Sequence, residues 1–248
     1  MTPKLTVSGS RADIVLDAPE RRNALGPEDV RALAAALDAI ERNAEIDVAV
    51  LSATGDTFCA GYDLHALRAD VSSSDAGDAQ RSFARVVDAL ENLRVPTLCV
   101  LRGGAYGGGT DLALACDVRL GTPRAKLAVP AARFGLQFYY GGLRRYVERL
   151  GVDAAKRIFL FAETFEGPEL LRLGFLHEIV SDEEIGAKAD HLVEGLLANV
   201  ANATGGLKRS LNAIARGDGR AETIDDAFAA SLRDPDTVER LTRRSPLA

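Results

Sequence analysis

Apolar residues alternate along the chain between short continuous runs and stripes of helical spacing, up to about residue 180. Three apolar runs bounded by turn-forming residues are typical of strands, namely 5–16, 48–51 and 98–101. The first run contains Gly9 and Ser10 in its middle and therefore predicts a hairpin. The other two are short and wholly apolar, which favours strands that are buried on both faces.

Stripes of apolar residues at intervals of three and four predict helices between these strands. One helix is expected over 27–43, with Pro27 in its first turn, and another over the segment that precedes Pro96. Their inward-facing residues are Val30, Leu33, Leu37 and Ile40 in the first helix and Phe83, Val86, Leu90 and Leu93 in the second. After a last extended piece at 175–180 only helical patterns remain, which predicts an α/β fold with an all-helical tail. Further helices are predicted over 147–161, 168–174, 181–200 and from 204 onward.

Three segments between these elements are predicted to be loops. The stretch 52–64 contains two glycines, and 69–79, rich in Ser, Asp, Ala and Gly, is expected to be the least ordered and mobile. The stretch 124–142 brings three aromatic residues close together, so we expect it to line a pocket. Those residues are Phe138, Tyr139 and Tyr140.

A glycine-dense turn with a carboxylate follows the strand at 98–101. Gly103 and Gly104 are expected to end the strand, Gly107, Gly108 and Gly109 form the turn, and a helix is predicted over 110–116. The unpaired N–H groups of a first helical turn favour an anion or oxyanion, and Asp111 lies within reach of it. A packing turn without a ligand is the alternative. A nucleotide loop is not expected, because Gly109 stands where a GxxxxGK[ST] motif needs lysine and Leu112 stands where a GxGxxG motif needs its last glycine.

Composition narrows the class of protein. At 248 residues, 26.4 kDa and 47% hydrophobic content, the chain suits one sizeable domain with an appendage. A net charge of −6 and a pI of about 5.2 argue against a nucleic-acid partner. No apolar run is long enough to span a membrane and the first residues lack a signal-peptide core, so we expect a cytoplasmic protein. Cys59, Cys99 and Cys116 are expected to be buried free thiols, and no metal site is predicted.

Three separated motifs resemble the crotonase (enoyl-CoA hydratase/isomerase) superfamily: PERRNAL at 19–25, FCAGYDLHAL at 58–67 and RGGAYGGGTDLALACDVRL at 102–120. The likeness continues through AVPAARFGLQFYYGGLRRYVERLG at 128–151. It implies a spiral of ββα units over 1–190 and a helical region over 191–248 that assembles homotrimers, or hexamers as dimers of trimers. It also implies an acyl-CoA thioester of fatty-acid metabolism as substrate, with coenzyme A as part of the substrate and no permanently bound cofactor.

The resemblance also implies the site residues. The backbone N–H groups of Tyr62 and Gly108 would hold the thioester oxygen as an enolate develops, and Asp111 would be the acid/base. Arg22 would meet a phosphate of CoA, and His65 occupies a place where many relatives have lysine. The full set of implied CoA contacts is Arg22, Ala24, Ala60, Asp63, Leu64 and Tyr106.

The second glutamate that hydratases of this superfamily use is absent, because Ala131 stands in its place. The first is shortened to Asp111, so we do not expect ordinary hydration. Tyr139 and Tyr140 are the nearest replacements, although a tyrosine with a pKa near 10 is a poor base. Glu163 and Glu166 are further acidic candidates, but the favoured interpretation places both in a solvated turn before the helix at Pro168.

Several reactions stay open at this point. An acyl-CoA decarboxylase, a double-bond isomerase and a thioester or carbon–carbon hydrolase all use a stabilised enolate or oxyanion. A homologue that binds CoA esters or a protein partner without turnover is the hypothesis from another class. The glycine turn and the retained Asp111 favour an enzyme.

Overall fold

The computed structural model describes residues 3–71 and 77–243 of the chain. The strands are β1 (Lys4–Ser8), β2 (Arg11–Leu16), β3 (Val48–Ala53), β4 (Thr57–Cys59), β5 (Thr97–Leu101), β6 (Gly104–Tyr106), β7 (Val118–Gly121), β8 (Lys126–Ala128), β9 (Thr164–Glu166) and β10 (Glu178–Ile179). The helices are α1 (Pro27–Arg42), α2 (Leu64–Val71), α3 (Asp78–Glu91), α4 (Gly108–Ala115), α5 (Tyr140–Leu150), α6 (Val152–Leu160), α7 (Pro168–Arg172), α8 (Ile185–Leu197), α9 (Ala201–Arg216), α10 (Ala221–Ser231) and α11 (Pro235–Thr242). Short 3-10 helices cover Pro19–Arg21 and Ala131–Phe134.

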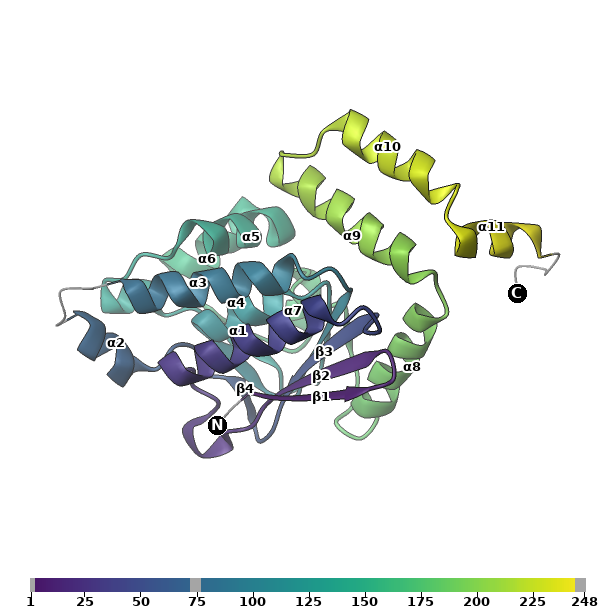
Figure 1. The fold of residues 1–248 in the computed structure, drawn as a ribbon. Coiled ribbons are helices and arrows are strands. Elements are labelled where there is room, and N and C mark those ends of the chain that lie inside the picture. Colours follow the sequence, from purple (N-terminus) through teal and green to yellow (C-terminus); the bar gives the residue numbers. More distant parts are fainter. Residues whose placement is uncertain (1–2, 72–76, 244–248) are drawn as a thin grey trace.

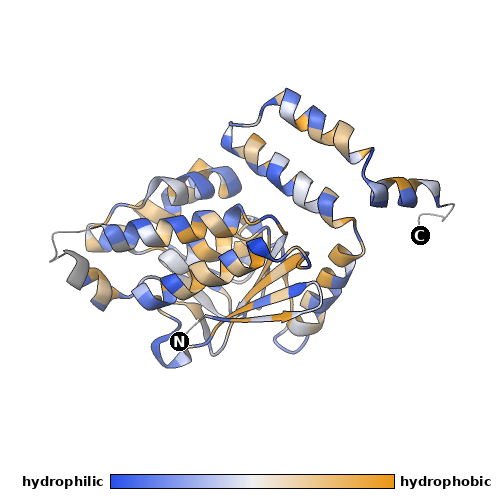
Figure 2. Cartoon of the chain, viewed as in Figure 1, coloured by the Kyte–Doolittle hydropathy of each residue, from blue (hydrophilic) through white to orange (hydrophobic). Residues whose placement is uncertain are grey.

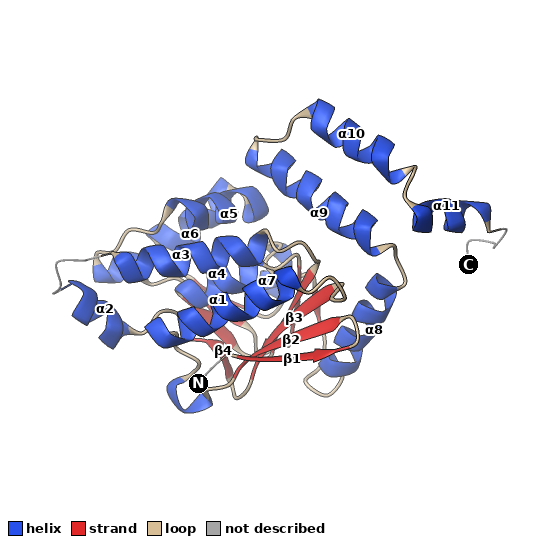
Figure 3. Ribbon diagram, viewed as in Figure 1, coloured by secondary structure: helices blue, strands red, loops and turns tan. Residues whose placement is uncertain are grey.

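The strands of the described residues form two sheets, and from β3 to β8 successive strands belong in turn to the larger and the smaller sheet. A six-stranded sheet has the order β1-β2-β3-β5-β7-β10, and a four-stranded sheet has the order β4-β6-β8-β9. The hairpin of β1 and β2 is antiparallel, and the other neighbours in the larger sheet are parallel. Each of β3, β5 and β7 enters the larger sheet and is followed by a strand of the smaller one, and helices then return the chain. This winding confirms the predicted α/β fold of ββα units (Figure 3).

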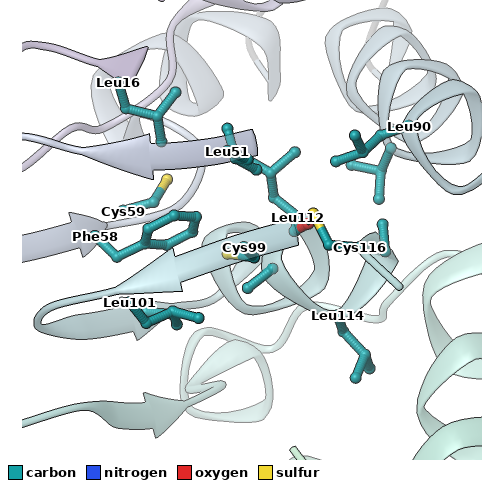
Figure 4. Close-up of a cluster of buried hydrophobic side chains, with 14 of the residues drawn as sticks. Leu16, Leu51, Phe58, Cys59, Leu90, Cys99, Leu101, Leu112, Leu114 and Cys116 are labelled. Carbon is teal, nitrogen blue, oxygen red and sulfur yellow. Dashed lines mark hydrogen bonds between the residues drawn. The ribbon is translucent and has the colours of Figure 1, made fainter. Parts of the chain in front are cut away.

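The larger sheet is covered by helices on both faces because its strands are apolar on both (Figure 1). In β3, Val48 and Val50 pack in a cluster with α8, whereas Ala49 and Leu51 pack in the main core with α1 and α3. Figure 4 shows this main core, where side chains of β2, β3, β4, β5, α3 and α4 gather. The three cysteines are free and buried, as predicted.

The C-terminal helices α9, α10 and α11 extend away from the two sheets (Figure 1). The ammonium group of Lys208 in α9 ties the tail to the body, since it lies 2.8 Å from the Asp117 carboxylate and donates to the Val95 carbonyl at 2.9 Å. The predicted boundary between residues 190 and 191 falls within α8, whose Ile185 and Val193 pack on the larger sheet.

Several local predictions were wrong because tertiary pairing formed short strands that have little pattern of their own. The predicted loop 52–64 contains β4, Gly104 opens β6 instead of ending a strand, and 124–142 contains β8. The predicted helix 147–161 is two helices, α5 and α6, because Gly151 between them has a φ of 83°. Of the segment 69–79, both ends are helical and residues 72–76 lie outside the described residues.

Candidate active site

The turn from β6 into α4 places Gly108 at the start of a buried helix. Gly107 has a φ of 51°, a backbone conformation that favours glycine, and its N–H donates to the Ala128 carbonyl at 2.9 Å. Gly108 is the first residue of α4, so its N–H has no acceptor within the helix. A Cβ atom on Gly109 would lie 2.5 Å from the Cys59 carbonyl oxygen, so the helix approaches β4 as closely as only glycine allows.

The segment before Tyr62 lies against this helix start. A Cβ atom on Gly61, which has a φ of 91°, would lie 3.1 Å from the Gly108 nitrogen and 2.6 Å from the Tyr106 carbonyl oxygen. Tyr62 follows directly and pairs with Leu25 in a parallel bridge. The two chain segments that carry the predicted oxyanion donors, at Tyr62 and Gly108, are therefore in contact.

Aromatic rings form a wall beside the two segments. Tyr62 meets Phe83 edge-on at 6.2 Å between ring centroids, and Phe83 meets Tyr139 edge-on at 6.4 Å. Tyr139 also stacks on Phe138, with centroids 5.0 Å apart. A Cβ atom on Gly108 would lie 2.8 Å from the ring of Phe83, which places this wall directly against the start of α4. The surroundings of Gly108 are apolar, and such surroundings strengthen hydrogen bonds to a developing negative charge.

Asp111 lies one turn into α4 and is fully buried. Its Oδ1 accepts a hydrogen bond from Nε of Arg145 at 2.9 Å, and its Oδ2 accepts from Nη2 of Arg145 at 3.2 Å and from the hydroxyl of Tyr139. Arg145 is also fully buried, on α5. The carboxylate is thus held by a two-pronged guanidinium and a phenol, which is the geometry of a strong charge-assisted pair.

Further charges surround the far side of Arg145. Its Nη1 donates to the buried Glu91 carboxylate at 2.6 Å, and its Nη2 lies 3.1 Å from the Asp88 carboxylate. Glu91 also pairs with Arg144 and, at 3.4 Å, with Arg149. Burial acts to raise the pKa of Glu91, but these arginines outweigh it and hold that pKa below its ordinary value. The cluster therefore keeps its charges in the interior by pairing them.

Tyr139 is a neutral hydrogen-bond donor in this setting. Burial and the charge of Asp111 both raise the pKa of Tyr139 well above the ordinary value of tyrosine. Burial alone would lower the pKa of Arg145, yet the charge and hydrogen bonding of Asp111 together with the charge of Glu91 outweigh it, and that pKa is raised as well. At neutral pH the group that faces Asp111 from Tyr139 is therefore an O–H, which can give a proton but is a poor acceptor of one.

The remaining acidic and aromatic candidates separate clearly. Tyr140 is 82% exposed at the start of α5, so it lies apart from the Asp111 cluster. Ala131 is half-buried against the main core. Glu163 pairs with Arg157 at 2.6 Å and Glu166 pairs with Lys126 at 2.8 Å, both at the surface. These glutamates form ion pairs of the kind that surfaces carry, outside the cluster around Asp111.

The residues implied to contact CoA gather around two loops. The guanidinium of Arg22 lies over the ring of Tyr106, 5.1 Å from its centroid, and the Arg22 carbonyl accepts a hydrogen bond from the Ala60 N–H at 2.9 Å. Ala24 follows two residues after Arg22 in the same loop. Leu64, which follows the Ala60 loop, is 48% exposed at the start of α2.

Asp63 has a structural role that the motif did not reveal. Its Oδ1 accepts hydrogen bonds from the N–H of His65 at 2.7 Å and of Ala66 at 3.1 Å, so it caps the start of α2. The same holds for Asn23 in PERRNAL, which is buried and donates to the carbonyls of Thr54 and Thr57. Part of each motif therefore holds loops in place around the site.

Arg145 is the site residue that the sequence analysis missed. It occurs in GGLRRYVERLG, among other arginines, where it resembles a solvated helix position. The available signal was its spacing: Gly142, Arg145 and Tyr146 are the buried residues of α5 and share the face that packs on α4. A charged residue on that face requires a buried partner of opposite charge, and Asp111 is such a partner.

Within the described residues there is no group of three or more His, Cys, Asp or Glu side chains placed to hold a metal ion. A search of the same residues finds no helix with the length and apolar character needed to cross a membrane.

Comparison with known proteins places this arrangement in a family. The family model described as enoyl-CoA hydratase/isomerase matches residues 7–231, which is most of the chain. The chain belongs to the enoyl-CoA hydratase/isomerase family. This confirms the resemblance seen in the motifs, and the protein is an acyl-CoA enzyme of this family.

Individual members of the enoyl-CoA hydratase/isomerase family align over almost the full length. The short-chain-enoyl-CoA hydratase of Clostridium acetobutylicum is 26% identical over 214 residues, 86% of this chain and 80% of the relative. The crotonyl-CoA hydratase of Syntrophomonas wolfei is 25% identical over 239 residues, 93% of this chain and 90% of the relative. The crystal structure of an enoyl-CoA hydratase/isomerase from Marinobacter aquaeolei has a TM-score of 0.88 at 26% identity, covering 97% of this chain and 94% of that one.

Proposed function

We propose that the protein binds an acyl-CoA and stabilises the enolate of its thioester between the backbone N–H groups of Tyr62 and Gly108. The observation that carries this proposal is the start of α4, where Gly108 lies in contact with the Tyr62 segment and against the ring of Phe83. Two donors aimed at one oxygen in apolar surroundings are worth several kcal/mol to a transition state that places negative charge there. The CoA portion would follow the loops of Arg22, Ala60 and Tyr106.

Ordinary hydration of an enoyl-CoA does not fit these residues. Hydration requires a base for water and an acid for carbon, and the position implied for the second glutamate is Ala131. The Asp111 carboxylate is occupied by Arg145 and Tyr139 on both oxygens. If Asp111 is involved in moving a proton, a second group must therefore reach the substrate.

Decarboxylation of a 2-carboxyacyl-CoA is the second candidate, and one observation favours it. Asp111, the carboxylate in the first turn of the helix that Gly108 begins, is ion-paired and enclosed, so it is not free to act as a base. Loss of carbon dioxide delivers the electron pair directly to the enolate, so this reaction needs the oxyanion donors and a proton source but no base.

A panel of CoA esters tests both candidates. Crotonyl-CoA, butyryl-CoA and malonyl-CoA are incubated with the protein in D2O, and mass spectrometry follows addition of water, deuterium at the α-carbon and loss of carbon dioxide. We expect fast change of malonyl-CoA and slow or no hydration of crotonyl-CoA. Rapid hydration of crotonyl-CoA by the wild type would contradict the hypothesis that Ala131 removes hydratase activity. In Ala131→Glu, hydration should be faster than in the wild type. Binding of all three esters without any reaction would leave the non-catalytic hypothesis.

We also propose that the helical tail assembles the chain into homotrimers, alone or paired as hexamers. The support is the set of large apolar side chains of α9, α10 and α11 that are exposed among the described residues of the single chain. Figure 2 shows hydrophobic positions along these helices, which extend away from the sheets. Large exposed apolar patches mark interaction sites in soluble proteins.

A further inference from the structure

Of the three side chains Asp111, Arg145 and Tyr139, Tyr139 is the one that retains exposed surface. Asp111 and Arg145 are fully buried, and both carboxylate oxygens accept hydrogen bonds from within the cluster. Tyr139, which donates to Asp111 Oδ2, is only partly buried and retains exposed surface. A group that exchanges a proton with a bound molecule must touch that molecule, so of the three side chains Tyr139 meets this requirement best.

Tyr139 also lies on the correct wall. Its ring meets Phe83 edge-on at 6.4 Å, and Phe83 is the ring that would lie 2.8 Å from a Cβ atom on Gly108. The proposed oxyanion donor at Gly108 and the ring of Tyr139 therefore lie against the same aromatic side chain.

We propose that Tyr139 is the catalytic residue that gives a proton to the α-carbon of the enolate, and that Asp111 and Arg145 are its positioning residues. This inference rests on the proposed function, because the enolate is the species that receives the proton. It distinguishes Tyr139 from the exposed Tyr140 and adds Arg145, which no motif implied.

The proposed proton transfer forms one C–H bond and breaks one O–H bond. The electron pair of the enolate forms a new C–H bond at the α-carbon while the O–H bond of Tyr139 breaks, and the thioester carbonyl is restored. The negative charge passes from the thioester oxygen to the phenolate oxygen of Tyr139, and water then returns a proton to it. Arg145 makes this transfer feasible because its guanidinium offsets the charge of Asp111 next to the phenolate.

The direction of transfer follows from the charges around Tyr139. Asp111 from α4 and Asp88 from α3 oppose a phenolate, and Arg145 from α5 favours one. Burial and the two carboxylates together outweigh Arg145, so Tyr139 is protonated when the reaction begins. A protonated Tyr139 can donate a proton and suits reactions that form an enolate without a base. The substrate class that this chemistry selects is a 2-carboxyacyl thioester.

The first experiment compares Tyr139→Phe with the matched control Tyr140→Phe. The probe is methylmalonyl-CoA in D2O, and the measurements are the rate of decarboxylation, the configuration of the deuterated product at its α-carbon and the affinity for butyryl-CoA by calorimetry. We expect butyryl-CoA binding to stay within about threefold of wild type in both variants. In Tyr139→Phe we expect either a loss of about 100-fold in kcat or a product with randomised configuration, with no such change in Tyr140→Phe.

The outcomes separate this inference from the proposed function. A wild type that decarboxylates with one configuration and a Tyr139→Phe variant that does so at the same rate and configuration would overturn the role of Tyr139 alone. A wild type that reacts only with esters lacking a 2-carboxylate would contradict the proposal that the enolate forms by decarboxylation and is then protonated by Tyr139. A wild type inactive on every ester removes the proposed function itself, and this inference with it.

The second experiment tests positioning. Arg145→Lys keeps the charge but loses the two-pronged contact with Asp111, so we expect about a tenfold loss in kcat with KM unchanged. Asp111→Asn removes the charge that opposes the phenolate, so we expect its activity to fall at a lower pH than that of wild type, in which the pKa of Tyr139 is raised well above its ordinary value. Circular dichroism checks that each variant is folded. An Asp111→Asn variant that is less stable but has the wild-type pH profile would show that the cluster is structural only.

Discussion

At the scale of single residues, the space around Gly108 makes the oxyanion proposal testable. Any side chain there would start with a Cβ atom 2.8 Å from the ring of Phe83, so the helix start or the aromatic wall must move. We expect Gly108→Val to lose at least the ~2.7–4 kcal/mol of transition-state stabilisation that one lost donor costs. Steady-state kinetics on the best ester of the panel measures this loss.

The control for this variant is Gly195→Ala in α8, where a Cβ atom has open space and which lies outside the site. Its turnover should equal that of wild type. Unchanged turnover in Gly108→Val as well would mean that the glycine turn serves packing alone.

The cysteines give a second prediction at this scale. Burial raises the pKa of the Cys59 thiol to about 12 and that of the Cys99 thiol well above its ordinary value. Because the thiolate is the reactive form, the native protein should not react with a disulfide reagent at pH 8, whereas three thiols should react in guanidinium. In Cys59→Ser, one thiol fewer should be counted after denaturation. Fast reaction of the native protein would show that the core opens on the time scale of the assay.

At the scale of elements, the break between α5 and α6 is set by one residue. Gly151 has a φ of 83° and a ψ of 156°, a conformation that side chains with Cβ avoid, although no atom lies within 4 Å of the Cβ position. Gly151→Ala should therefore cost about 1–3 kcal/mol in the free energy of unfolding through backbone strain alone. Urea denaturation followed by circular dichroism measures it.

Gly195→Ala is again the matched comparison, with the opposite sign. It lies within α8 with open space for a Cβ atom, so alanine should stabilise the protein by roughly 0.5–1 kcal/mol. Equal effects of the two substitutions would contradict the assignment of Gly151 as a strained helix break.

At the scale of the whole molecule, the tail predicts an assembly. Several large apolar side chains of the tail are more than half exposed in the single chain, namely Leu207, Leu211 and Ile214 in α9, Phe228 in α10, Leu232 directly after α10 and Leu241 in α11. We expect sedimentation at micromolar concentration to give a mass of three or six times 26.4 kDa. A species of 26.4 kDa would contradict the proposed trimer.

A charge in this apolar surface should weaken the assembly. Leu211→Glu is expected to shift the protein toward smaller species, because a carboxylate buried between subunits would lose its hydration. Val7→Glu is the control, since Val7 is also exposed but lies in the hairpin of β1 and β2. A shift in the control alone would move the interface away from the tail.

The sequence by itself determined the features that depend on neighbours along the chain. Buried strands such as β3 and β5 and helices such as α1 and α3 follow from the spacing of their apolar residues, and so does the place of Asp111 in the first turn of α4. The motifs likewise determined the family, because their glycines allow tight turns and their polar residues hold nearby loops by hydrogen bonds.

Only the tertiary structure decided what depends on contacts between distant segments. The short strands β4, β6 and β9 exist because they pair within the sheet β4-β6-β8-β9, and the three residues of each carry no periodic pattern. The spacing within α5 places Arg145 on a buried face, but Asp111 is 34 positions away, so neither the ion pair nor the hydrogen bond from Tyr139 follows from local spacing. The physical reason is that pairing and burial of charge depend on which segments the fold brings together, whereas helix and strand patterns depend on the chain itself.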